Sequence, residues 1–489
     1  MSDNLGARST IAFGWALGGQ FSNQIIGFVI TLVLARLLTP EEFGLASLVM
    51  VVNLFGQIFI DAGISSGLIR KKELNNTELS SFFFLNIFVG LLLMFLVYVT
   101  SAYIALLFES ESLRPLLQLS SLQFFISSLG LMPMIFLKRD INFRFLSQLD
   151  VGINVSSGII TILLAYGGFG VYSLIFRSII SGILNASFLW RQTSWRPSWV
   201  FSYESIKPTL NYSTGILGLE IVGTLFDNFS TILIGKVFSV STVGIYNRAA
   251  NTRGLVLKNF GPLFNKVFFP VLSKIQDDEV RLQSYYLKAI QMVSLLVVFA
   301  MAMLFLFSDT LIYYLYGKQW MGSAPMLKIL AIAGLVLPIS NINLNLFMVK
   351  GKSRFLMGFT MGKNIFGTVV MLVAIKFGMT YFLYSLVCIA YIFFFLNIFV
   401  VYKKLNFPIQ PQITAFTSKL IPALILVSLI ELFILPNEVS LTYTLLIAPI
   451  FSSLYFVIVF LIDKELYFLI KNMITPKFIQ LKAKLSRLF

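Results

Sequence analysis

The sequence predicts an all-α polytopic membrane protein with 14 transmembrane helices, and three observations support this prediction. Of the 489 residues, 57% are apolar and 12% are charged, whereas soluble domains average about 25% charged residues. Apolar segments of about 20 residues, the length that spans a bilayer, recur along the whole chain. The connections between them are short, the longest polar ones being 191–205 and 273–284. No connection is long enough to form a soluble catalytic domain.

The predicted spans follow one another in chain order, and each is defined by its apolar character. Their approximate limits are Ile11–Leu38, Phe43–Ile69, Leu79–Phe108, Leu113–Leu137, Ser147–Tyr166, Val171–Trp190, Ile206–Ile234, Thr242–Pro270, Tyr285–Phe307, Ala324–Val349, Phe355–Ile375, Thr380–Tyr402, Phe416–Leu435 and Leu441–Ile462. The first span follows a single arginine and is too long for the apolar core of a signal peptide, so we expect it to be retained.

Lysine and arginine are concentrated in alternate connections. If the N-terminus lies inside, 25 of the 37 basic residues fall in cytoplasmic segments and only 5 fall in outer connections. By the positive-inside rule, this distribution predicts that both termini are cytoplasmic. Most of the net charge of +16 is therefore explained by topology, and its location excludes nucleic acid as a partner.

The last segment, 464–489, is a basic tail. From Pro476 to Phe489 it alternates apolar residues with lysine and arginine. This pattern suits an amphipathic helix lying on an anionic leaflet. A plain cytoplasmic tail with no further role is the alternative.

The first twelve spans contain an internal repeat. Three pairs of segments match in the same order at nearly constant offsets of 200, 210 and 212 residues: 31–45 with 231–245, Arg144–Leu146 with Arg354–Leu356, and Tyr172–Leu174 with Tyr384–Leu386. We therefore predict two parallel six-helix lobes, residues 1–195 and 196–410, related by a pseudo-twofold axis along the membrane normal. Two more helices follow in 411–463. Paired lobes of this kind are typical of a transporter that alternates between inward-open and outward-open states.

Charged side chains inside the predicted spans are candidate functional residues, because a charge at the bilayer centre costs about 2.5 to 3.5 kcal/mol. Seven basic residues are expected to be buried or nearly buried there: Arg177, Arg248, Arg253, Lys258, Lys266, Lys328 and Lys363. Four acidic residues are expected to be buried: Asp61, Asp150, Glu220 and Asp227. The basic surplus predicts an electropositive interior, although the charges nearest the span ends can instead snorkel to the interface. Those residues are Asp150, Lys258, Lys266 and Lys328.

An electropositive interior attracts anions, and arginine forks match phosphate oxygens bidentately. We therefore predict a site for a phosphorylated substrate, formed by Arg177, Arg248, Arg253, Asn251 and Lys363. Candidates for loading a proton or a sodium ion during transport are Glu220, Asp227 and Asp61. A static ion pair to the eighth span is an equal alternative for Glu220 and Asp227. Hydrogen bonding between helices is the alternative for a single uncharged residue such as Asn251.

The sequence contains no histidine and one cysteine, Cys388. This excludes catalytic triads that use histidine, imidazole bases, histidine-ligated metal sites and an internal disulfide. We expect no cofactor, no metal and no enzymatic activity. Any proton coupling must use carboxylates.

Four groups of residues carry a family resemblance. They are Ala35–Gly44 (ARLLTPEEFG), Asp61–Gly63 with Leu68–Arg70, Leu137–Arg144 (LKRDINFR), and Ile234–Lys236 with Gly244–Ala249. On these residues the chain resembles the Wzx-type polysaccharide flippases, the polysaccharide transporter family of the multidrug/oligosaccharidyl-lipid/polysaccharide (MOP) exporter superfamily. Within that family it is most similar to the colanic-acid or exopolysaccharide branch.

The resemblance implies a bacterial inner-membrane protein that moves an oligosaccharide linked to undecaprenyl pyrophosphate from the cytoplasmic to the periplasmic leaflet. It implies alternating access coupled to a proton or sodium gradient, with membrane lipids, a glycan polymerase and the export machinery as further partners. It also implies cationic residues in a central cavity, a role that falls here on Arg177, Arg248 and Arg253.

Two rival functions are open at this point. A drug or organic-cation exporter of the same superfamily would need an acidic cavity, which the basic surplus disfavours. A membrane enzyme acting on polyprenol-linked sugars, such as a polymerase, would need catalytic groups in larger loops.

Overall fold

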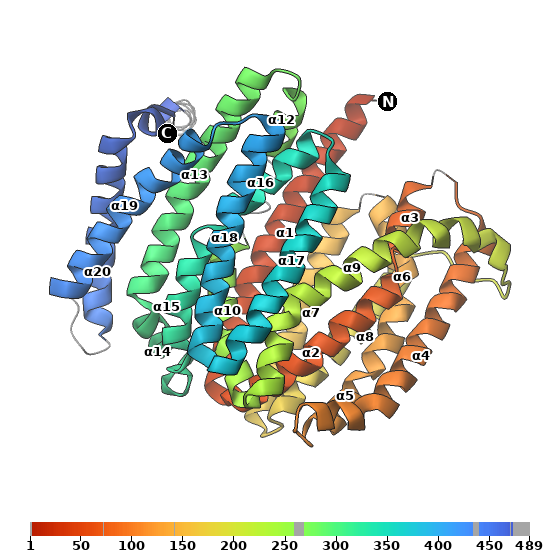
Figure 1. The fold of residues 1–489 in the computed structure, drawn as a ribbon. Coiled ribbons are helices and arrows are strands. Elements are labelled where there is room, and N and C mark those ends of the chain that lie inside the picture. Colours follow the sequence, from red (N-terminus) through yellow and green to blue (C-terminus); the bar gives the residue numbers. More distant parts are fainter. Residues whose placement is uncertain are drawn as a thin grey trace, which may run out of the picture. The chain divides into compact units, whose positions relative to one another are not determined.

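The computed structural model describes residues 2–71, 73–140, 142–258, 268–433, 440–469 and 471–472. Within them the chain forms helices and no strand, and 13 helices are long and apolar enough to cross a membrane (Figure 1). This confirms the predicted all-α polytopic class. The remaining predicted span, 242–270, begins with α10 and continues into residues outside this description. Most of the predicted tail, 464–489, also lies outside it.

The chain divides into two compact units, residues 1–247 and 248–489. The helices of the first unit are α1 (Ser2–Leu37), α2 (Pro40–Asp61), α3 (Ile64–Arg70), α4 (Asn76–Leu107), α5 (Leu113–Ser120), α6 (Leu122–Arg139), α7 (Phe143–Tyr166), α8 (Val171–Gln192), α9 (Tyr203–Val237) and the first part of α10 (Val240–Leu257). The predicted lobe boundary at residue 195 is defined by the repeat and stays a prediction.

The second unit begins inside α10. Its further helices are α12 (Phe269–Lys274), α13 (Glu279–Leu306), α14 (Ser308–Tyr316), α15 (Ser323–Gly334), α16 (Leu337–Val349), α17 (Ser353–Ala374), α18 (Met379–Leu405), α19 (Ile409–Phe433) and α20 (Leu441–Ile462), with the short 3₁₀ turns η2 (Lys318–Trp320) and η3 (Ile375–Phe377).

Local sequence signals determine where several helices begin. The Thr39 hydroxyl accepts the N–H of Glu42 (3.3 Å), and the Glu42 carboxylate accepts the N–H of Thr39 (2.7 Å). This capping box, followed by Pro40 at the first helical position, starts α2. Asp278 starts α13 in a similar way by accepting the N–H of Arg281 (3.0 Å).

Three predicted spans are broken helices, and one of them, 113–137, contains α5 and α6 on either side of Ser121. The span 43–69 contains α2 and α3, which are separated by Ala62 and Gly63, both with positive φ (43° and 72°). The Asp61 carboxylate accepts the N–H of Ser65 (3.1 Å), a donor that would otherwise be free at the start of α3. The span 324–349 likewise contains α15 and α16. Continuous apolar character does not reveal such breaks, because both halves remain in the membrane.

Helix packing places the core differently in the two units. In the first, α7 packs along α1 and α8, while α6 packs along α4 and α8 (Figure 1). In the second, α13 is central and packs against α15, α16 and α19. Tyr286, Ile290 and Val297 of α13 are fully buried there. By contrast, α4 exposes large apolar side chains such as Phe95 and Leu106, as expected of a surface that faces lipid.

A reciprocal glycine contact joins α2 to the first turns of α10. A Cβ added at Gly44 would overlap the carbonyl oxygen of Val240, and one added at Gly244 would overlap the carbonyl oxygen of Pro40. Both pairs obey the repeat offset of 200 residues, since Gly44 corresponds to Gly244 and Pro40 to Val240. A pseudo-twofold axis between two copies of one motif produces such a self-complementary contact. Glycine is required at both positions because the backbones touch.

We expect Gly244→Leu to force α2 and α10 apart and to lower the free energy of unfolding by about 1 to 3 kcal/mol. The matched control is Gly254→Leu on the same helix, where an added Cβ would meet only Lys258 Cε at 3.8 Å. Thermal melting of the solubilised proteins measures both effects. Equal melting temperatures for the two variants would contradict the close contact.

Candidate functional site

Arg177 is held by a polar network within the first unit. It lies on α8, and its Nη2 donates to Asn154 Oδ1 on α7 (2.8 Å). The Asn154 amide nitrogen in turn donates to the backbone carbonyl (3.1 Å) and the side-chain oxygen (3.2 Å) of Asn23 on α1. Because the Asn154 nitrogen has two oxygen acceptors, its own oxygen must face Arg177. The guanidinium is only half-buried, so part of it remains available to a ligand.

Lys363 has a similar environment in the second unit. It lies on α17, only 7% exposed, and its Nζ donates to Asn397 Oδ1 on α18 (2.9 Å). The rings of Phe359 and Phe393 lie 4.9 and 5.3 Å from the same nitrogen. Asn397 Nδ2 contacts the carbonyl of Ser340 on α16 at 3.5 Å.

Neither Arg177 nor Lys363 forms an ion pair with an acid in the part of the chain that the structure describes. Amide oxygens orient these two cations but do not neutralise them. An uncompensated charge inside a membrane-spanning helix is costly. Such a charge is expected where an anion binds during part of a working cycle.

The internal repeat relates the two networks. Gly152–Asn154 (Gly-Ile-Asn) of α7 aligns with Gly362–Asn364 (Gly-Lys-Asn) of α17 at an offset of 210. At an offset of 212, Leu184–Asn185 of α8 aligns with Leu396–Asn397 of α18. Each helix pair thus carries the same asparagines, but the cation is on the second helix in the first copy and on the first helix in the second copy. Sequence reasoning overlooked Asn397, although extending the repeat would have found it.

Arg248 on α10 is enclosed by aromatic rings. Its guanidinium carbon lies 4.6 Å from the Tyr316 ring centroid and 4.5 Å from that of Trp320, and the residue is 5% exposed. Thr252, one turn further along α10, hydrogen-bonds the Tyr316 hydroxyl (3.0 Å) and holds that ring in place. Cation–π contacts of this kind stabilise a buried guanidinium. Arg248 is therefore less accessible than Arg177.

Arg253 and Asn251 lie further along α10. Arg253 is half-buried, and its Cδ passes close to Gly334 of α15, where an added Cβ would lie 3.5 Å from that atom, an ordinary van der Waals distance. Asn251 is exposed. Arg248 and Lys363 contact different side chains, so the structure does not bring these two cations to one shared partner.

The three predicted ion-coupling carboxylates have two kinds of environment. Glu220 and Asp227 are exposed on α9, and within the first unit neither forms an ion pair among the described residues. A carboxylate exposed on a membrane-spanning helix must face a water-filled space, because lipid would not tolerate it. Asp61 instead contacts the backbone N–H of Ser65 at the α2–α3 break.

The surroundings of three other charged residues show that they add little charge to the interior of the protein. Lys328 of α15 pairs with Asp309 of α14 (2.7 Å), so it adds no net charge to the site. Lys258 is exposed at the end of α10, and Asp150 is exposed on α7. Lys266 lies outside the described residues. The surplus of interior positive charge therefore falls on Arg177, Arg248, Arg253 and Lys363.

The fold is similar to that of known transporters. A solved lipid II flippase, MurJ, in an inward closed conformation superposes with a TM-score of 0.76 at 16% identity, covering 92% of this chain and 99% of that one. An inward-facing multidrug resistance MATE family transporter of the MOP superfamily superposes with a TM-score of 0.59 at 14% identity, covering 84% and 96%. The chain therefore has the fold of the MOP transporters.

Sequence comparison is more specific than fold. The model of the family described as "Polysaccharide biosynthesis protein" matches residues 33–325, well over half of the chain. The chain belongs to this family, as its resemblance to polysaccharide flippases predicts.

The similar proteins are bacterial. An uncharacterized membrane protein in the cps region of Klebsiella pneumoniae is 28% identical over 360 residues, 72% of this chain and 73% of that protein. The teichuronic acid biosynthesis protein TuaB of Bacillus subtilis is 26% identical over 405 residues (81% and 80%), and the lipopolysaccharide biosynthesis protein WzxC of Escherichia coli K12 is 24% identical over 359 residues (72% and 71%). The apolar helices and these relatives identify a multi-pass bacterial membrane protein.

Because of the Lys363–Asn397 contact, we expect a single variant and a double variant at these positions to differ in stability. Asn397→Leu leaves a buried ammonium without its acceptor and should lower the free energy of unfolding by about 1.5 to 3 kcal/mol. The double variant Lys363→Met, Asn397→Leu removes both partners and should be at least as stable as the wild type. Thermal melting distinguishes the two variants. A double variant that melts as low as Asn397→Leu would show that the lysine itself stabilises the fold.

Proposed function

We propose that this protein is a flippase that moves a lipid-linked oligosaccharide across the bacterial inner membrane for polysaccharide biosynthesis. Its family, its MOP transporter fold and its relatives named for the biosynthesis of lipopolysaccharide and teichuronic acid support this function. The substrate is an oligosaccharide linked to undecaprenyl pyrophosphate, as the resemblance to Wzx-type flippases implies. Both termini are cytoplasmic, in accordance with the lysine and arginine distribution.

The observation that carries the proposal is the pair of intramembrane cations oriented by asparagines rather than by acids. In a low-dielectric interior, a positive charge without a counter-ion attracts an anionic group strongly. The Arg177 guanidinium can bind two phosphate oxygens at once, and Lys363 supplies a point charge. A pyrophosphate headgroup fits this chemistry, because each phosphate brings negative charge and oxygen acceptors.

Transport proceeds by alternating access between the two lobes defined by the repeat. The reciprocal contact of Gly44 and Gly244 lies at the outer end of α2 in the proposed orientation. Glu220 and Asp227 on α9 couple the cycle to a proton or sodium gradient, because exposed carboxylates can gain and lose a cation. Asp61 is a weaker candidate, since its carboxylate caps α3.

The main rival, export of organic cations, is disfavoured by the same charges. MATE transporters share the fold, but intramembrane cations such as Arg177 and Lys363 each repel a cationic drug. A membrane enzyme would need catalytic groups outside the helices, and the connections are short. The flippase works beside a glycan polymerase and export machinery, which receive its product.

We expect Arg177→Gln to lower surface polysaccharide at least tenfold in a host lacking the native gene, because the phosphate loses its charged partner; tenfold corresponds to about 1.4 kcal/mol. The matched control is Arg191→Gln, at the exposed cytoplasmic end of the same helix. Polysaccharide and membrane-inserted protein are measured together. Normal export by the double variant Arg177→Gln, Lys363→Met would refute the anion site.

Ion coupling is tested separately in proteoliposomes with lipid-linked oligosaccharide extracted from the host. Transport should accelerate under a proton or a sodium gradient, and Asp227→Asn or Glu220→Gln should abolish that acceleration without removing basal flipping. Asp278→Asn, which alters a helix cap and an exposed ion pair with Arg281, is the control. If wild-type transport responds to neither gradient, Glu220 and Asp227 have a structural role and do not couple transport to an ion.

A further inference from the structure

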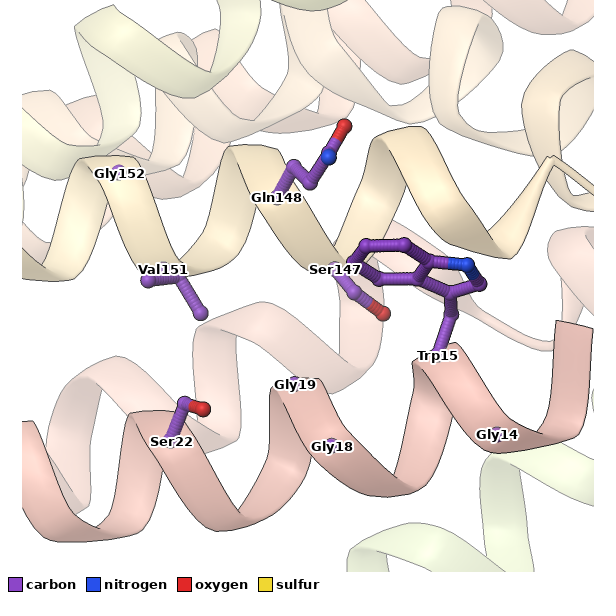
Figure 2. Close-up of a pocket in the computed structure, with 9 residues that line it drawn as sticks. All are labelled: Gly14, Trp15, Gly18, Gly19, Ser22, Ser147, Gln148, Val151 and Gly152. Carbon is purple, nitrogen blue, oxygen red and sulfur yellow. The ribbon is translucent and has the colours of Figure 1, made fainter. Parts of the chain in front are cut away.

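A cavity of about 660 Å³ lies between α1 and α7, entirely within the first unit (Figure 2). Its α1 side is formed by Gly14, Trp15, Gly18 and Ser22, and Ser147 and Gln148 contribute from α7. The volume is within the range of small-ligand sites. It is separate from the Arg177 network, which none of these residues joins.

Glycines on α1 keep this cavity open. A Cβ added at Gly14 or Gly18 would meet no atom within 4 Å, so the missing side chains leave empty space above the helix backbone. Gly19 is different, because a Cβ there would lie 2.6 Å from Ser147 Cβ and the two helices touch at that point. Gly14 and Gly18 are one turn apart and therefore lie on the same face. The floor of the cavity is thus an exposed strip of glycine backbone.

Trp15 forms one wall. Its ring extends from α1 toward α7 beside Ser147 (Figure 2), and the residue is 38% exposed. The Arg144 guanidinium carbon lies 5.1 Å from the ring centroid, which orients the indole and places a positive charge beside the cavity. The hydroxyls of Ser22 and Ser147 point into the gap between the two helices. The cavity therefore combines an aromatic face, hydroxyl groups and one neighbouring cation.

We infer that this cavity binds the sugar ring next to the phosphate of a glycosyl phosphate. This inference rests on the proposed function and names a subsite for its substrate. A pyranose has an apolar C–H face that covers an aromatic ring, and hydroxyls around its edge that hydrogen-bond to serine and glutamine. Arg144 is placed to attract the attached phosphate. A prenyl chain would make no use of the hydroxyls or the charge.

Binding is tested on the full-length protein in lipid nanodiscs, labelled with 5-fluorotryptophan. Trp15→Phe assigns the Trp15 resonance among the five tryptophans. The probes are the 1-phosphates of glucose, galactose and mannose, with inorganic phosphate and farnesyl phosphate as comparisons. At least one hexose 1-phosphate should shift the Trp15 resonance saturably, at least tenfold more tightly than inorganic phosphate. Gly18→Leu, whose Cβ would meet no atom within 4 Å and whose side chain occupies the cavity, should abolish that shift.

Three results would overturn the inference. They are no shift with any hexose 1-phosphate, an equal response to inorganic phosphate, and a response to farnesyl phosphate alone, which would assign the cavity to a prenyl chain. A soluble sugar phosphate and the lipid-linked substrate share this chemistry. Competition by extracted lipid-linked oligosaccharide shows that the substrate itself is recognised, whereas its failure to compete would also refute the subsite.

Export provides the second readout. Gly18→Leu should lower surface polysaccharide at least tenfold at normal protein level, whereas Gly358→Leu on α17, which also meets no atom within 4 Å, should leave it unchanged. Normal export by Gly18→Leu, together with loss in Arg177→Gln, would refute the subsite and leave the proposed function intact. Failure of the wild-type gene to restore export would refute the proposed function instead.

Discussion

The cost of an unsatisfied polar group in hydrocarbon determines the rest of this structure. It restricts the spanning segments to helices, whose backbone bonds are internal, and it requires a partner wherever a helix breaks or a charge is buried. Asp61 supplies that partner at the α2–α3 break, and Asp463 does so after α20 by accepting the N–H of Leu466. Asp463 also pairs with Lys419, a fully buried lysine of α19. Against this background, Arg177 and Lys363 stand apart, because amides orient them and neither pairs with an acid among the residues that the structure describes.

The two copies of the repeat keep the same asparagines but place the cation differently. Arg177 lies on the second helix of its pair, whereas Lys363 lies on the first helix of its own pair. The predicted repeat therefore extends to the glycines of the Gly44 and Gly244 contact but not to the positions of the charges. A substrate whose headgroup and sugar ends differ does not need a symmetric site.

The sequence alone was sufficient to predict the helical class, most span limits and the charged residues of the interior. Hydropathy and periodicity report which residues lie in the membrane and which face they share. They do not report partners that are distant in sequence. Nothing in the sequence near Arg248 indicates that Tyr316 and Trp320 enclose it, and nothing near Lys419 indicates that it is buried against Asp463. The cavity beside Trp15 was likewise not predicted, because glycines within an apolar helix do not change its hydropathy pattern.

Accessibility separates the four interior cations into two groups with different physical roles. Arg177 and Arg253 are half-buried and can contact a ligand directly, whereas Arg248 and Lys363 are nearly covered by aromatic rings. A covered cation still acts on an anion, since Coulomb energy falls only as the inverse of distance and is weakly screened in a medium of low dielectric constant. Direct hydrogen bonds fix orientation and must break when the substrate leaves. A longer-range field would attract an anionic headgroup without holding it in one position, and we propose that this combination serves both loading and release.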